Sequence, residues 1–125
     1  GDLDSMNHVN HTVFLRWMEN ARMHYFNSCG MMDYLESEKK GPILARIEAN
    51  YLFPVNFPEK VSVSSTVSRI GNTSFDMEYE IITLSNMQKV AVGKVIGVFV
   101  NYKNGKSEKI PQEIISKILN LESRD

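Results

Sequence analysis

The sequence has little cysteine, almost no net charge and no long apolar run. It contains one cysteine, Cys29, so no internal disulfide can form and nothing indicates an oxidising compartment. It has 14 basic and 15 acidic residues, and this balance disfavours binding to nucleic acid or to anionic lipid. No apolar run approaches the roughly 20 residues that cross a bilayer, and the N-terminus lacks a signal-peptide pattern. We therefore expect a soluble cytoplasmic protein with no membrane association.

The composition fits a single globular domain. The chain has 125 residues, of which 42% are hydrophobic and 23% charged, so disorder, collagen-like repeats and disulfide scaffolds are poor fits. We find no internal repeat, low-complexity tract or linker. One domain over residues 1–125 is the expectation.

A long amphipathic helix is predicted over residues 12–29. Its large apolar residues recur at steps of three and four, which places them on one helix face: Phe14, Trp17, Met18, Ala21 and Tyr25. Asn10 or Thr12 can cap the start, and Gly30 ends the helix.

After Gly41-Pro42 the hydrophobic period changes to two, which predicts strands. The first strand covers 43–53, with one face expected in a core: Ile43, Ala45, Ile47, Ala49, Tyr51 and Phe53. Two half-buried strands follow over 61–68 and 75–81, and the nearly continuous apolar run 90–102 is typical of a central strand. Its two glycines, Gly93 and Gly97, would let another backbone or a ligand approach closely. A last helix begins at Pro111.

This order of elements predicts an α+β fold in which one long helix lies across an antiparallel sheet. The helix is about 27 Å long at about 1.5 Å per residue, and ten-residue strands span about 33 Å, so the sheet can curl around the helix. Such a sheet has two unpaired edges. Pairing one edge with a second copy of the chain would satisfy it, and we predict a homodimer.

The segment from Gly1 to His11 concentrates acids, imidazoles and amides just before the helix start. Amides at a helix N-terminus favour an oxygen that is becoming negative. Asp4 can attack a carbonyl or draw a proton from water, while amides near Val9 and Asn10 polarise the carbonyl oxygen. These two functions together indicate acyl transfer or hydrolysis.

These residues resemble the signature of a known family, the 4-hydroxybenzoyl-CoA thioesterase-like branch of the hot dog-fold acyl-CoA thioesterases. The matching segments are Asp2-x-Asp4-x-x-x-His8-Val9-Asn10, Phe14-Leu15-x-Trp17-x-Glu19-x-Ala21-Arg22 and Gly71-Asn72-Thr73-Ser74-Phe75. The resemblance covers nearly the whole chain. It implies a helix wrapped by an antiparallel sheet, edge-to-edge homodimers that often pair into homotetramers, and a thioester site at the dimer interface.

The resemblance also implies roles for single residues. Asp4 matches the catalytic carboxylate, and His8 lies in the pocket at the helix start. The likeness makes Val9 and Asn10 the substrate-binding amide donors. Ser74 is a further candidate for contact with the substrate, although an outward serine on a strand is more often solvated. Two departures are present: the family has a strand ahead of the Asp-x-Asp, so the sheet is expected to lack one, and His11 stands where the family commonly has asparagine.

Each of these residues also has a simpler interpretation. Asp4 could cap the helix, and His8 could hydrogen-bond a backbone group and shape the loop. Glu19 and Arg22 suit an ion pair on the helix, although another hot dog branch carries its catalytic acid on this helix.

No cofactor or metal is expected. His8 and His11 are three residues apart, but no third ligand stands at a recognisable spacing. Cys29 lacks the partners of a nucleophile and is expected to be buried and inert. The lysines around residues 39–40 and 103–109 are expected to be solvated, although one could contact a coenzyme A phosphate.

The sequence therefore predicts an acyl-CoA thioesterase that releases a free acid and CoA. The alternatives are a thioesterase acting on acyl carrier protein and a non-catalytic hot dog domain that binds an acyl ligand. A dehydratase is disfavoured, because Asp4 and His8 alone do not supply its paired acid and base.

Overall fold

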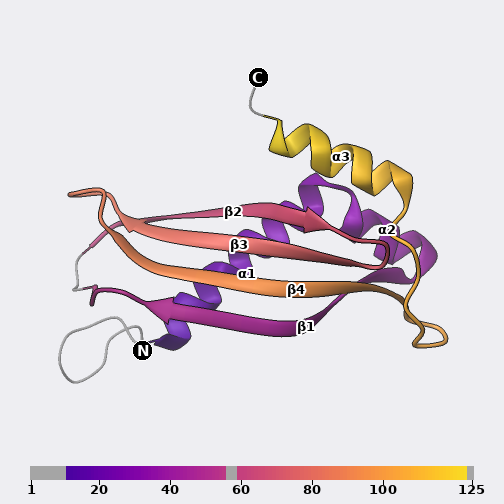
Figure 1. The fold of residues 1–125 in the computed structure, drawn as a ribbon, viewed down its shortest axis with the longest axis horizontal. Coiled ribbons are helices and arrows are strands. Elements are labelled where there is room, and N and C mark those ends of the chain that lie inside the picture. Colours follow the sequence, from indigo (N-terminus) through magenta and orange to yellow (C-terminus); the bar gives the residue numbers. More distant parts are fainter. Residues whose placement is uncertain (1–10, 56–58, 124–125) are drawn as a thin grey trace.

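The computed structural model describes residues 11–55 and 59–123. A long helix and a short one precede four strands, and a third helix follows them (Figure 1). The elements are α1 (His11–Ser28), α2 (Met31–Glu38), β1 (Lys40–Tyr51), β2 (Val61–Ile70), β3 (Ser74–Thr83), β4 (Lys89–Asn101) and α3 (Gln112–Glu122).

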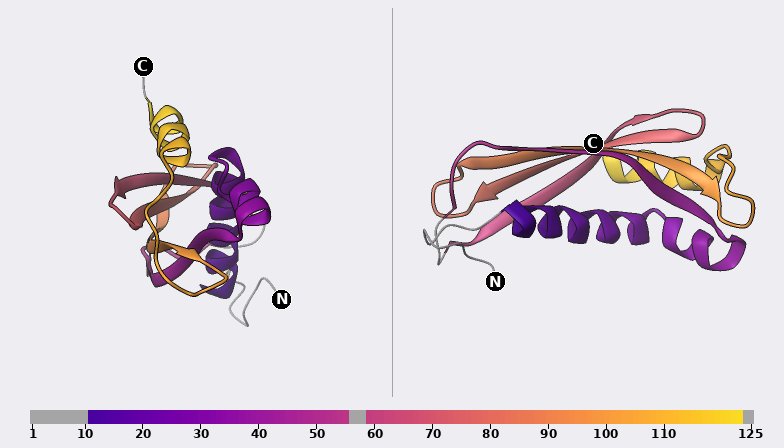
Figure 2. Two further views of the ribbon diagram at one scale, coloured as in Figure 1. Left: turned by 90° about the vertical axis from the view of Figure 1, so that its right-hand side faces the viewer. Right: turned by 90° about the horizontal axis from the view of Figure 1, so that it is seen from below.

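The four strands form one antiparallel sheet in the order β1-β4-β3-β2. Helix α1 runs across one face of this curved sheet, and none of the described helices covers the other face (Figure 2). Helix α3 lies beside β2. The predicted α+β arrangement, with a long helix across an antiparallel sheet, is confirmed.

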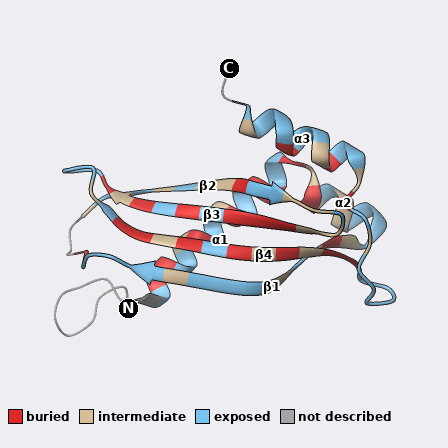
Figure 3. Cartoon of the chain, in the orientation of Figure 1, coloured by how far each residue is buried: buried red, intermediate tan, exposed pale blue. Residues whose placement is uncertain are grey.

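The core lies between α1 and the inner face of the sheet, and buried positions alternate along β3 and β4 (Figure 3). The inward side chains of β3 are almost fully buried: Phe75, Met77, Tyr79 and Ile81. They pack against Phe14, Met18 and Phe26 of α1. The two glycines of β4 are closely approached, but by core side chains and not by the expected backbone or ligand: a methyl group on Gly93 would overlap Met18, and one on Gly97 would overlap Phe75.

Helix α2 is an element that sequence periodicity did not predict. Gly30 ends α1 in the left-handed conformation, at φ 85°, and α2 begins at the next residue. Its eight residues are too few for a clear 3.6-residue pattern, and Met31 alone among them is fully buried. The helical conformation of this segment therefore depends on tertiary packing.

Strand β1 differs from its prediction in which side chains are covered. A bulge between Leu44 and Arg46 breaks the simple alternation, so Ile43 faces outward with Val98 while Ile47 faces the helix side with Val95. Ile47 is 51% exposed and Tyr51 44% exposed, although both were expected in the core. The reason is position, because β1 is an edge strand with a neighbour on one side only.

The opposite edge, at β2, is partly occupied by α3. The Glu122 carboxylate accepts a hydrogen bond from the Val67 backbone amide at 3.0 Å and another from the Tyr25 hydroxyl at 2.5 Å. Burial, and then the contact with Glu122, raise the pKa of Tyr25 well above its usual range, so this phenol stays a donor. An acid from the last turn of α3 thus satisfies one edge amide and joins α1, β2 and α3.

Candidate active site

The start of α1 lies against the end of β1, and this junction is the described part of the candidate site. The ring of Phe14, in the first turn of α1, lies 5.1 Å from the ring of Tyr51, the last residue of β1. Trp17 packs edge-on against Phe14 at 5.4 Å. An aromatic cluster of Phe14, Trp17 and Tyr51 therefore stands where the helix N-terminus, which favours negative charge, meets the open edge of the sheet.

The residues predicted to carry the chemistry directly precede this helix start. Asp4, His8, Val9 and Asn10 lie outside the described residues, so their roles stay predictions. Helix α1 begins at His11, within one residue of the predicted start. The four residues thus lead into the helix end at which partial positive charge collects.

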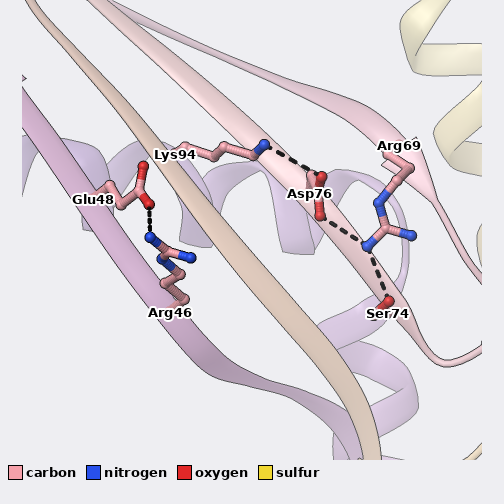
Figure 4. A network of polar contacts seen from close by, with 6 residues as sticks. All are labelled: Arg46, Glu48, Arg69, Ser74, Asp76 and Lys94. Carbon is pink, nitrogen blue, oxygen red and sulfur yellow. Dashed lines mark hydrogen bonds and ion pairs between the residues drawn. The ribbon is translucent and has the colours of Figure 1, made fainter.

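Ser74 is the one predicted site residue that the structure describes. It is the first residue of β3, and its hydroxyl accepts a hydrogen bond from Arg69 at 3.0 Å (Figure 4). Ser74 pairs with Val98, which in turn pairs with Ile43, eight positions before Tyr51 on β1. At about 3.3 Å per residue this is about 26 Å from the helix start, so one protomer does not bring Ser74 together with the aromatic cluster.

A polar network on the outer face of the sheet was not predicted from the sequence. Asp76 is 8% exposed, and its carboxylate contacts Arg69 at 2.9 Å and Lys94 at 3.6 Å (Figure 4). The Arg69 hydrogen bond, above all, holds the pKa of Asp76 below its usual value. Period-two alternation places these residues on one face, but only strand register shows that they touch. The network links β2, β3 and β4, and we assign it to stability.

The expected ion pair between Glu19 and Arg22 is not formed. Arg22 is 9% exposed and donates to the Tyr79 hydroxyl at 3.3 Å, while Glu19 is exposed on α1. Burial raises the pKa of Tyr79, and the nearby Arg22 partly offsets that effect. The contact belongs to the packing of α1 on the sheet.

Cys29 is fully buried, as predicted, and burial raises the pKa of its thiol. A buried thiol with a raised pKa is a poor nucleophile, so the cysteine belongs to the core.

Residues 11–55 and 59–123 contain neither a metal-binding cluster nor a membrane-spanning helix. No group of three or more His, Cys, Asp or Glu side chains in these ranges could hold a metal ion. None of the helices in the same ranges is long and apolar enough to cross a membrane.

A long helix lying across a curved antiparallel sheet is the arrangement of the hot dog fold. The family model described as the thioesterase-like superfamily matches residues 1–118. The chain belongs to this superfamily, and it is a thioester hydrolase. A search of curated proteins found no match.

Solved structures agree with this assignment. A thioesterase from Thermus thermophilus, complexed with coenzyme A and zinc, is 31% identical, with a TM-score of 0.84 over 99% of this chain and 88% of that one. A Pseudomonas aeruginosa protein described as a thioesterase is also 31% identical, with a TM-score of 0.82 over 94% and 90% of the two chains. A 1,4-dihydroxy-2-naphthoyl-CoA thioesterase from Synechocystis, 18% identical, has a TM-score of 0.85 over 98% and 91% and shares the fold.

Proposed function

We propose that this protein is an acyl-CoA thioesterase that uses Asp4 as its catalytic carboxylate. The observation that carries the proposal is the position of α1: it starts one residue after the segment from Asp4 to Asn10, against the open edge of β1. The similar thioesterase from Thermus thermophilus, complexed with coenzyme A, supports a CoA thioester as the substrate.

In the proposed reaction, Asp4 removes a proton from a water molecule as the water oxygen attacks the thioester carbonyl carbon. The carbonyl oxygen becomes negative, and the amides of Val9 and Asn10 stabilise it at the helix start. The tetrahedral intermediate then collapses, the carbon–sulfur bond breaks, and the thiolate leaves and is protonated. His8 orients the loop or hydrogen-bonds the substrate. The products are a free acid and CoA.

The proposal is tested by a panel of acyl-CoA thioesters of graded chain length, including aromatic acyl groups. We expect release of free CoA thiol well above the spontaneous rate, with a preference for one part of the panel. Thiol release is followed with a chromogenic disulfide. The aromatic cluster at the helix start favours the aromatic substrates as the first to try.

The same panel carried on acyl carrier protein tests the main alternative. The exposed lysines near residues 103–109 favour this alternative, because carrier proteins that are acidic would dock on a basic surface. Turnover of the carrier-protein thioesters alone would contradict the CoA assignment. A bound acyl ligand seen by mass spectrometry, with no turnover of either panel, would indicate the non-catalytic binding domain.

We further propose that the protein is a homodimer joined through β1. Glu122 and α3 occupy part of the β2 edge, whereas β1 presents backbone groups together with exposed Ile47 and Tyr51. An edge strand with apolar side chains is a surface that a second antiparallel copy can cover. A tetramer would require a second surface, such as the outer face of the sheet.

Replacing Ile47 by lysine tests the β1 edge. Two lysines brought together at the centre of the interface would repel and would remove an apolar contact, so we expect the dimer to dissociate at micromolar concentration. Size-exclusion chromatography with light scattering measures the molar mass in solution, which is compared with the 14.3 kDa of one chain. Leu119→Lys is the matched control, because Leu119 is 60% exposed on α3. A dimer that survives Ile47→Lys but not Leu119→Lys would place the interface at α3.

A further inference from the structure

A loop between β4 and Ser107 carries cations without a carboxylate partner. Lys103 and Lys106 are both exposed, and neither pairs with an acid among the described residues. Lys40, by contrast, forms an ion pair with Glu108 at 2.9 Å. We call residues 102–106 the basic loop, and its two lysines form an uncompensated positive patch.

The basic loop is held in one conformation by local hydrogen bonds. The side-chain oxygens of Asn101 and Asn104 accept from the backbone amides of Lys103 and Lys106, at 2.8 and 2.9 Å. The Asn101 amide donates to the Lys106 carbonyl at 2.8 Å, and Gly105 supplies the left-handed residue at φ 74°. The backbone positions of the two lysines are therefore preorganised for binding.

The basic loop lies at the opposite end of β1 from the candidate active site. The Tyr102 amide donates to the Lys39 carbonyl, and the Tyr102 hydroxyl donates to the Pro42 carbonyl at 2.6 Å. Both contacts fix the loop beside the start of β1, whereas the helix start contacts Tyr51, the last residue of that strand. Eleven steps of about 3.3 Å separate the two ends by about 36 Å, so a protomer cannot offer both to one substrate.

In a dimer formed through β1, the basic loop of one protomer lies near the α1 start of the other. In an antiparallel pair centred on Ile47, residue 43 of the partner subunit lies opposite Tyr51, and the partner's basic loop is carried to the α1 start of the first protomer. The two-fold axis of such a pair is perpendicular to the sheet, so both helices α1 stay on one side. The basic loop bends from the sheet toward the helix layer, the same side (Figure 2).

We propose that Lys103 and Lys106 bind the phosphate groups of the acyl-CoA in the active site of the other protomer. Each site then combines the α1 start of one subunit with two cations from its partner, and it is incomplete in a monomer. Ammonium groups on a fixed loop are suited to phosphate oxygens, and acyl-CoA carries its phosphates far from the thioester. This inference rests on the proposed thioesterase function and on the β1 dimer.

The phosphate assignment is tested by the double variant Lys103→Gln/Lys106→Gln. We expect CoA itself to bind about tenfold more weakly by titration calorimetry, with a smaller salt dependence. The specificity constant for acyl-CoA, divided by that for the phosphate-free S-acyl-N-acetylcysteamine, should fall about tenfold. Lys117→Gln, at an exposed lysine on α3, is the control and should leave both quantities unchanged. Unchanged CoA affinity in the double variant would overturn the proposal.

These readouts separate this proposal from the proposed function. Lysine-dependent CoA binding without thioester turnover would support the phosphate site and contradict the hydrolase assignment. Normal turnover with unchanged CoA affinity in the double variant would overturn the phosphate site alone. A loss confined to carrier-protein thioesters would assign the lysines to an acidic protein surface and overturn the CoA assignment.

Mixed dimers test whether the lysines act across the interface. Asp4→Asn chains and Lys103→Glu/Lys106→Glu chains are co-expressed with different tags, and the mixed dimer is purified with both. If the lysines act on the other protomer, one site has wild-type Asp4 and wild-type lysines, so KM for acyl-CoA returns to the wild-type value with about half the kcat. A mixed dimer that keeps the raised KM of the lysine variant would overturn action across the interface.

Discussion

Replacing Asp4 by asparagine should lower kcat for thioester hydrolysis by about 10²- to 10⁴-fold, the range that a positioned acid–base group contributes. Asparagine keeps the shape of the side chain but cannot accept the proton of the attacking water. Substrate binding should change little, because the amides at the helix start and the phosphate-binding groups remain. Steady-state kinetics with the best acyl-CoA of the panel measures kcat and KM separately.

Asp2→Asn is the matched control for this experiment. It removes the same charge from the same segment, two residues away, and it should keep most of the activity because the resemblance assigns the catalytic role to Asp4, the second acid of the motif. Wild-type kcat in Asp4→Asn would contradict the assignment of Asp4. Glu19→Gln would then test the remaining alternative, since Glu19 is exposed on α1 and another hot dog branch carries its acid on this helix.

Replacing Gly97 by alanine should destabilise the protein by about 3 kcal/mol, a large part of the 5–15 kcal/mol typical of a domain. The added methyl group would meet the ring of Phe75, with Cε1 at 2.7 Å and Cε2 at 2.9 Å. Phe75 is fully buried and packs edge-on against Phe26 at 6.0 Å, so the ring has little room to move. Urea unfolding followed by circular dichroism gives the free energy of unfolding.

Gly93→Ala provides the comparison on the same strand and the same face. Its methyl group would overlap the sulfur of Met18, which ends a flexible side chain, and would lie 3.3 Å from the Glu48 carbonyl oxygen. Met18 can change rotamer, so we expect a loss of about 1 kcal/mol. Equal losses at the two positions would show that Phe75 adapts as readily as Met18, and the rigid-ring argument would be wrong.

The long elements could be predicted from sequence because hydrophobic spacing records which face of an element is buried. The spacing of Phe14, Met18 and Tyr25 predicted α1, and the alternation of apolar and polar residues predicted β2 and β3. Each of these elements is long enough to repeat its pattern several times. Helix α2 has eight residues, and its helical state depends on the burial of Met31. Alternation also predicted Ile47 and Tyr51 as core residues, because it reports a preference for burial and not whether a neighbour is present to cover the side chain.

The candidate site also combines features that local sequence predicts with features that depend on tertiary contacts. The chain order of Asp4, His8 and Asn10 before an amphipathic helix is a local pattern, so the sequence alone predicted the chemistry and the class of enzyme. The contact between Phe14 and Tyr51, the Asp76 network and the position of the basic loop join residues far apart in the chain.

The long helix, the strands and the predicted catalytic residues could be inferred from the sequence, because each inference depends on neighbours a few positions apart. The folded chain was needed to show that β1 is the open edge, that Glu122 occupies part of the other edge, and that Lys103 and Lys106 lie a full strand away from the helix start. Strand order and register set these distances, and neither is encoded in local periodicity.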